Sequence, residues 1–138
     1  MKMSEQDVFD TLRYRIVVDV YGLRRYYNSA NQLHRTDGPA VTDTSGNQWW
    51  YQNGKLHRTN GPAVVWRDGS KDWFQDGQLH RTDGPAIEYS DGDKSWFQNG
   101  QRHRIDGPAV EWESGRKEWY INDVGMTEAE FNQAVKAL

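Results

Sequence analysis

The chain has 138 residues, a length that fits one domain. Its mean hydropathy of -1.00 is low for a globular core, but 13% of its residues are aromatic, which argues against a disordered chain. The absence of cysteine excludes disulfides and thiolate zinc sites, and the net charge of -3 provides no bulk attraction to nucleic acid or anionic lipid.

The N-terminal segment, residues 1–14, is expected to cap the fold with a short amphipathic helix. Ser4 can serve as its N-cap, and Val8, Phe9 and Leu12 would form its apolar patch. The segment lacks a signal-peptide pattern, and no apolar run in the chain approaches the ~20 residues of a membrane span. We therefore expect a cytoplasmic protein without a membrane span.

Residues 15–122 are expected to form a single repeat sheet. The octapeptide LHRTDGPA at residues 33–40 returns, with small changes, at 56–63, 79–86 and 102–109, which gives a fixed period of 23 residues. Residues 17–32 resemble a degenerate copy of the segment that precedes the later octapeptides. The sequence thus contains four units, and the first is irregular.

The units contain turn signals of two kinds, which form two series along the chain. The two-residue hairpin signals are Asn53-Gly54, Asp76-Gly77 and Asn99-Gly100, and the second series consists of Asp68-Gly69, Asp91-Gly92 and Ser114-Gly115. A helix cannot persist through breakers this frequent, and the segments between them are β-prone. We predict a mostly β fold, an elongated and twisted antiparallel β-meander of hairpin repeats with two main strands in each unit.

Alternation along these strands places an aromatic row on each face of the sheet. Trp50, Trp73, Trp96 and Trp119 form one row, and Tyr51, Phe74, Phe97 and Tyr120 point the opposite way. On the neighbouring strand, the apolar face carries Val64 with Trp66, Ile87 with Tyr89, and Val110 with Trp112, whereas Glu88 and Glu111 point to the other face. We expect one aromatic row to be packed and the other to be available, unless the terminal helices or a second subunit cover it.

The octapeptide itself is interpreted as a turn. Its Asp or Asn closes the turn, its Gly supplies a positive φ, its Pro ends the strand pairing, and its Ala permits close packing beneath an aromatic ring. Its His is expected to donate from the ring to a backbone carbonyl, and its Arg to pair with carboxylates. Alternatively, the arginines form an exposed basic row that binds the phosphates of a nucleic acid, a nucleotide or a lipid head group. This row consists of Arg35, Arg58, Arg81 and Arg104.

The repeated histidines do not predict a metal site. Equivalent residues of neighbouring units lie about 10 Å apart, because two strand spacings separate them, whereas zinc holds each donor at about 2 Å. The sequence also lacks a nucleophile elbow, and its paired carboxylates are strand residues expected to face solvent. We expect no enzyme activity, no catalytic residues, no metal and no cofactor.

The C-terminal segment, residues 123–138, is expected to form a capping helix. Thr127 and Glu130 have the spacing of a capping box, and Phe131, Val135 and Leu138 follow at helical intervals. Repeat arrays need such caps, because an open sheet edge pairs with other chains.

Over residues 15–122 the 23-residue unit resembles a divergent MORN repeat. Residues 73–77 (WFQDG) and His80 match the first half of that pattern, and Gly84, Ile87, Tyr89 and residues 91–92 match the second. The chain departs from the pattern by placing Arg-Thr-Asp between His and Gly, and Pro-Ala after that Gly. This HRxDGPA variant is similar to tandem repeats in proteins of bacteriophages, large viruses and bacteria. The resemblance implies an elongated β-sheet that serves as an interaction scaffold for proteins or lipids, without catalytic residues.

The leading functional expectation is therefore a non-enzymatic scaffold that binds another macromolecule, and the expected partner is a protein. Acidic groups beside aromatic rings suit a basic partner, such as a nucleic-acid-binding protein. The expected contact residues are Tyr51, Phe74, Phe97, Tyr120, Glu88 and Glu111. The likeness to phage repeats adds, by analogy, inhibition of a host factor or of a host defence such as CRISPR, in the host cytoplasm. The alternatives are a phosphate ligand on the arginine row, and a homodimer through the sheet edge or the aromatic face.

Overall fold

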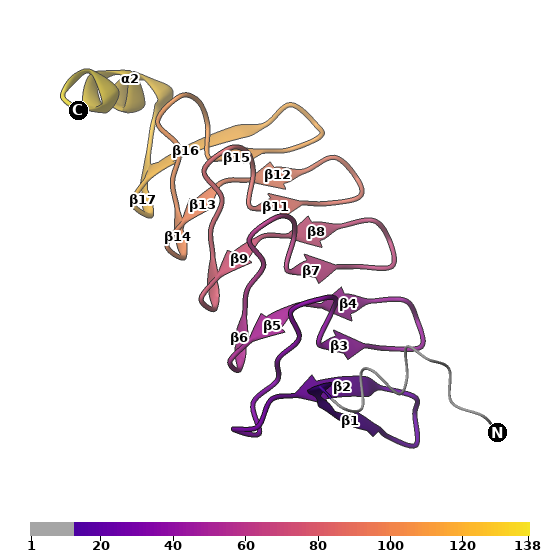
Figure 1. The fold of residues 1–138 in the computed structure, drawn as a ribbon. Helices are drawn as coiled ribbons and strands as arrows, with labels where there is room; N and C mark the ends of the chain where they lie inside the picture. Colours follow the sequence, from indigo (N-terminus) through magenta and orange to yellow (C-terminus); the bar gives the residue numbers. More distant parts are fainter. Residues whose placement is uncertain (1–12) are drawn as a thin grey trace.

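The computed structural model describes residues 13–138. The repeats stack side by side into an elongated array that ends in a C-terminal helix (Figure 1). Eleven strands form one antiparallel sheet, in the order β1-β2-β3-β4-β7-β8-β11-β12-β15-β16-β17. The predicted mostly β architecture is confirmed, whereas the predicted helix around Val8 and Phe9 falls outside the described residues.

The strands are short, and most contain two residues. Those of the sheet are β1 (Arg15–Val18), β2 (Arg24–Tyr27), β3 (Val41–Thr42), β4 (Gln48–Trp49), β7 (Val64–Val65), β8 (Lys71–Asp72), β11 (Ile87–Glu88), β12 (Lys94–Ser95), β15 (Val110–Glu111), β16 (Lys117–Ile121) and β17 (Val124–Met126). The remaining strands form three separate two-stranded ribbons, which are β5 (Tyr51–Gln52) with β6 (Lys55–Leu56), β9 (Phe74–Gln75) with β10 (Gln78–Leu79), and β13 (Phe97–Gln98) with β14 (Gln101–Arg102).

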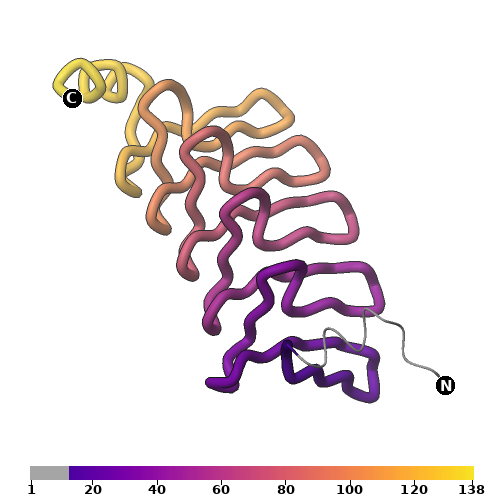
Figure 2. The backbone as a smooth tube through the Cα atoms, viewed as in Figure 1, coloured from indigo at the N-terminus to yellow at the C-terminus, as the bar shows by residue number. Residues whose placement is uncertain are grey.

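A complete repeat therefore has two hairpins. One hairpin, such as β7–β8, adds two strands to the sheet, and the next, such as β9–β10, forms a ribbon outside it (Figure 2). In the ribbon turn both Asp76 and Gly77 have positive φ, as a type I′ turn requires, whereas the sheet turn has positive φ at Gly69. The two series of turn signals in the sequence thus correspond to two different turns.

The sequence did not predict that the ribbons leave the sheet. The reason is the octapeptide, whose residues from His to Ala (34–40, 57–63, 80–86 and 103–109) are called the HRxDGPA loops from here on. Each loop returns the chain from a ribbon to the next sheet strand and lies between successive ribbons. Other backbone bonds replace strand pairing there, because Arg81 N of the loop donates to Phe97 O at 3.1 Å, and Gly100 N of the next ribbon turn donates to Leu79 O of β10 at 2.9 Å.

The core is thin, as the low hydropathy indicated. The alanine that ends each HRxDGPA loop is completely buried, and these residues are Ala40, Ala63, Ala86 and Ala109. Helix α2 (Glu128–Lys136) closes one end of the array and buries Phe131. The predicted capping box is confirmed, because Thr127 Oγ1 accepts from Glu130 N at 3.2 Å. The last strand of the sheet, β17, ends at Met126, directly before the residue that caps α2. No helix within residues 13–138 is long and apolar enough to cross a bilayer.

Candidate functional site: an aromatic face and a charged loop face

The arginine of each HRxDGPA loop is held over an aromatic ring. The Arg81 guanidinium carbon lies 3.9 Å from the centre of the Trp73 ring, so the side chain is stacked and partly shielded from water. Its Nε donates to Asp83 at 2.9 Å, and its Nη1 donates to Glu88 Oε1 and to the carbonyl of Pro85, each at 3.0 Å. Arg81 thus ties its own loop to the next sheet strand.

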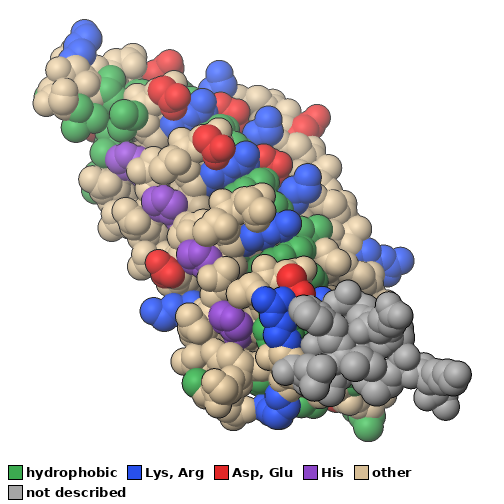
Figure 3. Space-filling view, viewed as in Figure 1, with side chains coloured by type: hydrophobic (Ala, Val, Ile, Leu, Met, Phe, Trp, Pro, Cys, Tyr) green, Lys and Arg blue, Asp and Glu red, His purple; other side chains and the backbone are tan. Residues whose placement is uncertain are grey.

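The same arrangement recurs along the array. Arg104 lies 4.0 Å from the Trp96 ring centre, and it pairs with Asp106 at 2.8 Å and with Glu111 at 2.9 Å. Arg35 lies over Tyr26 and pairs with Asp37. The predicted pairing of loop arginines with carboxylates is present in these three loops. Figure 3 shows the resulting line of basic side chains running along the array beside the line of histidines.

The loop glycines do not supply the positive φ that the sequence predicted. Positive φ values occur at the turn glycines, and Gly84 is not among them. A Cβ placed on Gly84 would instead lie 2.9 Å from the Arg81 guanidinium carbon. The other three loops have the same close approach at 2.9–3.0 Å. Glycine is therefore required because the arginine lies directly on the loop backbone.

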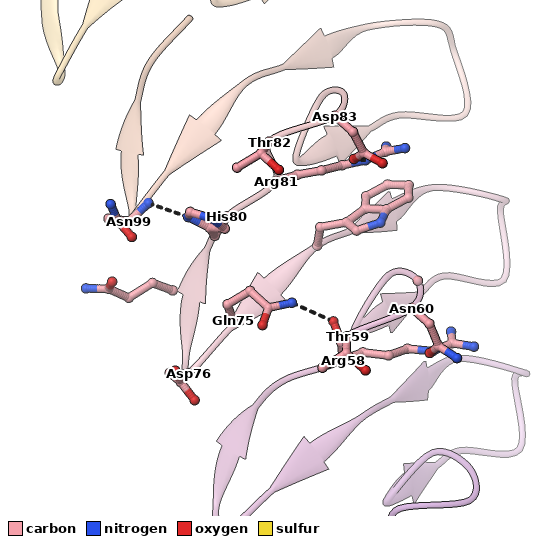
Figure 4. A pocket seen from close by; sticks show the side chains of 13 residues that line it. Arg58, Thr59, Asn60, Gln75, Asp76, His80, Arg81, Thr82, Asp83 and Asn99 are labelled. Atoms are coloured by element: carbon pink, nitrogen blue, oxygen red, sulfur yellow. Dashed lines mark hydrogen bonds and ion pairs between the residues drawn. The ribbon is translucent and has the colours of Figure 1, made fainter.

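The histidines also act differently from the prediction. His80 Nδ1 accepts a bond from the backbone N of Asn99 at 3.0 Å, so this ring nitrogen acts as an acceptor (Figure 4). The equivalent bonds, at 3.0–3.1 Å, run from Asn53 N to His34, from Asp76 N to His57 and from Asn122 N to His103. Each histidine thus ties its loop to the ribbon turn of the next repeat. Within residues 13–138 no group of three potential metal ligands is present.

The residues predicted to contact a protein do not form one exposed surface. Tyr51, Phe74 and Phe97 lie on the ribbons and Tyr120 lies on β16, and all four are half-buried. Glu88 and Glu111 lie on the face of the sheet that meets the HRxDGPA loops, where they bind Arg81 and Arg104. Charge reversal at either glutamate would therefore break an internal ion pair as well as any contact with a partner.

The more exposed aromatic row lies on the opposite face of the sheet, which is called the aromatic face from here on. Its exposed rings are Trp66, Tyr89 and Trp112, with exposed fractions of 37%, 48% and 39%. They follow Val64, Ile87 and Val110 at alternate positions, as the sequence predicted, but they were not among the expected contact residues. The buried alanines were the available signal, because they identify the other face as the one covered by the loops.

A hollow of about 650 Å³ lies between the first two of these rings. Its lining consists of Asn47, Trp66, Arg67, Asp68, Ser70, Asp72, Ile87 and Tyr89. Trp66 Nε1 donates to Asp72 Oδ2 at 3.0 Å, which fixes the indole and the carboxylate side by side. The hollow combines two aromatic rings with the carboxylates of Asp68 and Asp72 and with the Arg67 side chain.

The electrostatics of this hollow are acidic. Burial raises the pKa of Asp72 above its ordinary value, and the charge of Asp68 adds to the rise, against the opposing effect of the Trp66 hydrogen bond. Burial also raises the pKa of Tyr89, and the charges of Asp72, Asp93 and Asp91 contribute further. Burial is the larger cause of both shifts, and the aspartate charges that add to them make the surroundings of the two groups more negative.

The last repeat already contains such a cation. The Arg116 guanidinium carbon lies 5.7 Å from the Trp112 ring centre, and its Nη2 lies 2.8 Å from Glu118 Oε1. Glu118 pairs with Val110 across the sheet just as Asp72 pairs with Val64. One repeat period earlier than Arg116 the residue is Asp93, and two periods earlier it is Ser70. The position that supplies an arginine to Trp112 therefore holds Asp93 or Ser70 in the earlier repeats, and the arginine that lines the hollow at Trp66 is Arg67.

No protein-family model matches the chain, and no curated protein matches it in sequence.

Proposed function

We propose that the protein is a non-enzymatic repeat scaffold that binds a basic segment of another protein through its aromatic face. The observation that carries the proposal is the hollow formed by Trp66, Asp72 and Tyr89, which joins exposed rings to a partly buried carboxylate. Aromatic rings attract cations through their faces, and a carboxylate adds a charge-assisted hydrogen bond. A lysine or arginine side chain from the partner matches both features.

The intramolecular contact of Arg116 supports this assignment. It places a guanidinium on Trp112 and against Glu118, and the sheet presents Trp66 and Asp72 in the equivalent places. Ser70 stands there in the position of Arg116, and the basic residue that lines the hollow is Arg67 at its edge. The rings recur once in each repeat, so neighbouring sites lie about 10 Å apart along the array. A basic segment lying along the sheet would place successive cationic side chains on successive rings.

A capped peptide tests the recognition directly. We expect Ac-Gly-Arg-Gly-NH2 to shift the indole N–H signal of Trp66 in ¹H–¹⁵N spectra of the labelled protein, and Ac-Gly-Gln-Gly-NH2 to leave it unchanged. D72N should abolish most of the response, because it removes the carboxylate while keeping an acceptor for the indole. Trp112 serves as the internal reference, because Arg116 and Glu118 already form the equivalent contact there.

Affinity capture then tests binding to proteins. Wild-type protein should retain proteins through basic segments, and the double variant W66A/Y89A should lose them. The matched control F74A/F97A changes the same number of rings on the ribbons and should retain binding. The proposal would be refuted by an arginine peptide that does not perturb Trp66, or by capture that depends on Phe74 and Phe97 instead.

A further inference from the structure

One loop arginine differs from the others. In the second HRxDGPA loop, Arg58 lies 4.1 Å from the Trp50 ring centre, and its Nη1 donates to the carbonyl of Pro62 at 3.1 Å. These contacts match those of Arg81 and Arg104. Its guanidinium carbon also lies 3.0 Å from a Cβ built on Gly61, against 2.9 Å for the pair Arg81 and Gly84. The loop therefore places the Arg58 guanidinium in the same position as in its neighbours.

The carboxylates that bind the neighbouring arginines are missing at Arg58. Asn60 occupies the place of Asp83, and Val65 occupies the place of Glu88 (Figure 4 shows the two loops one above the other). Among the described residues, Arg58 makes no ion pair. The N–H groups on Nε and Nη1 of Arg58 therefore point to places that carboxylates occupy beside Arg81 and Arg104.

The surroundings of Arg58 also favour an anion. Lys71 pairs with Val65 across the sheet, so its ammonium group is presented to the same face of the sheet. Two carboxylates of the adjacent loops are already paired, because Asp37 pairs with Arg35 and Asp83 with Arg81. Burial lowers the pKa of Arg58 below its ordinary value, which is the response of a cation without a counter-charge.

The site is accessible from solvent. A groove of about 870 Å³ between the second and third loops is lined by Arg58, Thr59 and Asn60 on one side and by Arg81 and Asp83 on the other. Figure 4 shows these side chains projecting from the two loops. Because Arg58 lines this groove, a ligand in it contacts the arginine.

We propose that Arg58 is the centre of a carboxylate-binding site, in which an external carboxylate takes the place that the Glu88 side chain has at Arg81. The two neighbouring loops give the expected geometry, with carboxylate oxygens 2.9–3.0 Å from Nη1. Trp50 holds the guanidinium flat, so its donors are oriented before the ligand arrives. This site lies on the loop side of the sheet, so it is independent of the aromatic face and of the function proposed for it.

The arginine Nε–H signals of the full ¹⁵N-labelled chain provide the test. Sodium acetate, added against sodium chloride at constant ionic strength, should shift the Arg58 signal in a saturable manner and leave the Arg81 signal in place. The variant V65E should show a shifted Arg58 signal without acetate and lose the response to it. The reciprocal variant D83N/E88V should make Arg81 respond to acetate.

The outcomes separate the alternatives clearly. An Arg58 signal that does not respond to acetate, or that responds only to phosphate, overturns the proposal. So does a D83N/E88V variant that remains folded, as its dispersed spectrum would show, but whose Arg81 gains no response. Ac-Gly-Glu-Gly-NH2 distinguishes the source of the carboxylate, because a response like that to acetate supports a glutamate of a protein partner. A response to acetate alone supports a small free acid in the same site.

Discussion

Replacement of Gly84 by alanine tests the central contact of the HRxDGPA loop. A Cβ at this position would lie 2.9 Å from the Arg81 guanidinium carbon, so the arginine must move away from Trp73, Glu88 and the Pro85 carbonyl. The stacking and the partly buried ion pair contribute about 0.5–1 kcal/mol each, and the bond to the carbonyl about 1 kcal/mol. Alanine offsets about 0.4–1 kcal/mol of this loss by restricting the unfolded chain. We therefore expect G84A to lower the free energy of unfolding by about 1–2 kcal/mol in urea denaturation.

A double-mutant cycle identifies the cause of that loss. In the R81A background the guanidinium is absent, so G84A should become neutral or should stabilise the protein by about 0.4–1 kcal/mol. The φ of Gly84 lies outside the left-handed region, so alanine introduces no backbone strain of its own. An equal loss from G84A in both backgrounds would show that the arginine does not impose the glycine, and the reasoning would be wrong.

Two further predictions concern the hydrogen bonds between repeats and the dependence on pH. In H80A the backbone N–H of Asn99 loses its acceptor, so we expect its amide to exchange faster in hydrogen-exchange measurements, while the amide of Asn53, which is bound by His34, keeps its protection. The Arg81 hydrogen bond holds the pKa of Asp83 below its ordinary value, and Asn47 and Arg102 do the same for Asp43 and Asp123. A group with a lowered pKa contributes stability above its ordinary pKa, and this stability is lost as the pH falls through the pKa of the folded state. The urea concentration at the unfolding midpoint should therefore decrease as the pH is lowered below about 4. Asp72, whose pKa is raised, has the opposite sign, and a midpoint that rises on acidification would contradict the prediction.

Much of the fold could be predicted from the sequence because its turns are local. The dipeptides Asn53-Gly54 and Asp76-Gly77 encode type I′ turns through their backbone preferences alone, and the structure has positive φ at all four residues. Thr127 and Glu130 likewise specify the start of α2 within a few residues. The 23-residue period then fixes the order of the hairpins, since each repeat contacts mainly its neighbours.

The departures from prediction arise where segments distant in sequence meet. The alternation of Trp73 and Phe74 suggested one continuous strand, but the next HRxDGPA loop pairs with the ribbon and separates it from the sheet. The Asp-Gly-Pro sequence has the composition of a turn, and only the packing shows that Gly84 makes room for Arg81. Strand alternation assigns residues to the two faces of the sheet, but it does not specify which face the loops cover. The exposure of the aromatic face could therefore not be predicted from alternation alone.

The two proposed sites share one feature, which is that each lies where the repeat departs from its own pattern. The regular loop is electrostatically complete, because Arg81 and Arg104 each bind two carboxylates of the chain and leave little capacity for a ligand. At Arg58 two substitutions, to Asn60 and Val65, remove these internal partners while the guanidinium keeps its position.

On the aromatic face the missing partner is an arginine instead of a carboxylate. Arg116 completes the site at Trp112 in the last repeat, and its position holds Asp93 and Ser70 in the earlier repeats, so Trp66 and Asp72 lack the equivalent contact. An unbalanced charge is costly to keep in a partly buried place unless something binds it. In a repeat protein, some internal pairs recur in most units but are missing from one. The unit that lacks the pair is therefore the first place to examine for a ligand. Here that criterion selects a cationic ligand on one face of the sheet and an anionic ligand on the other.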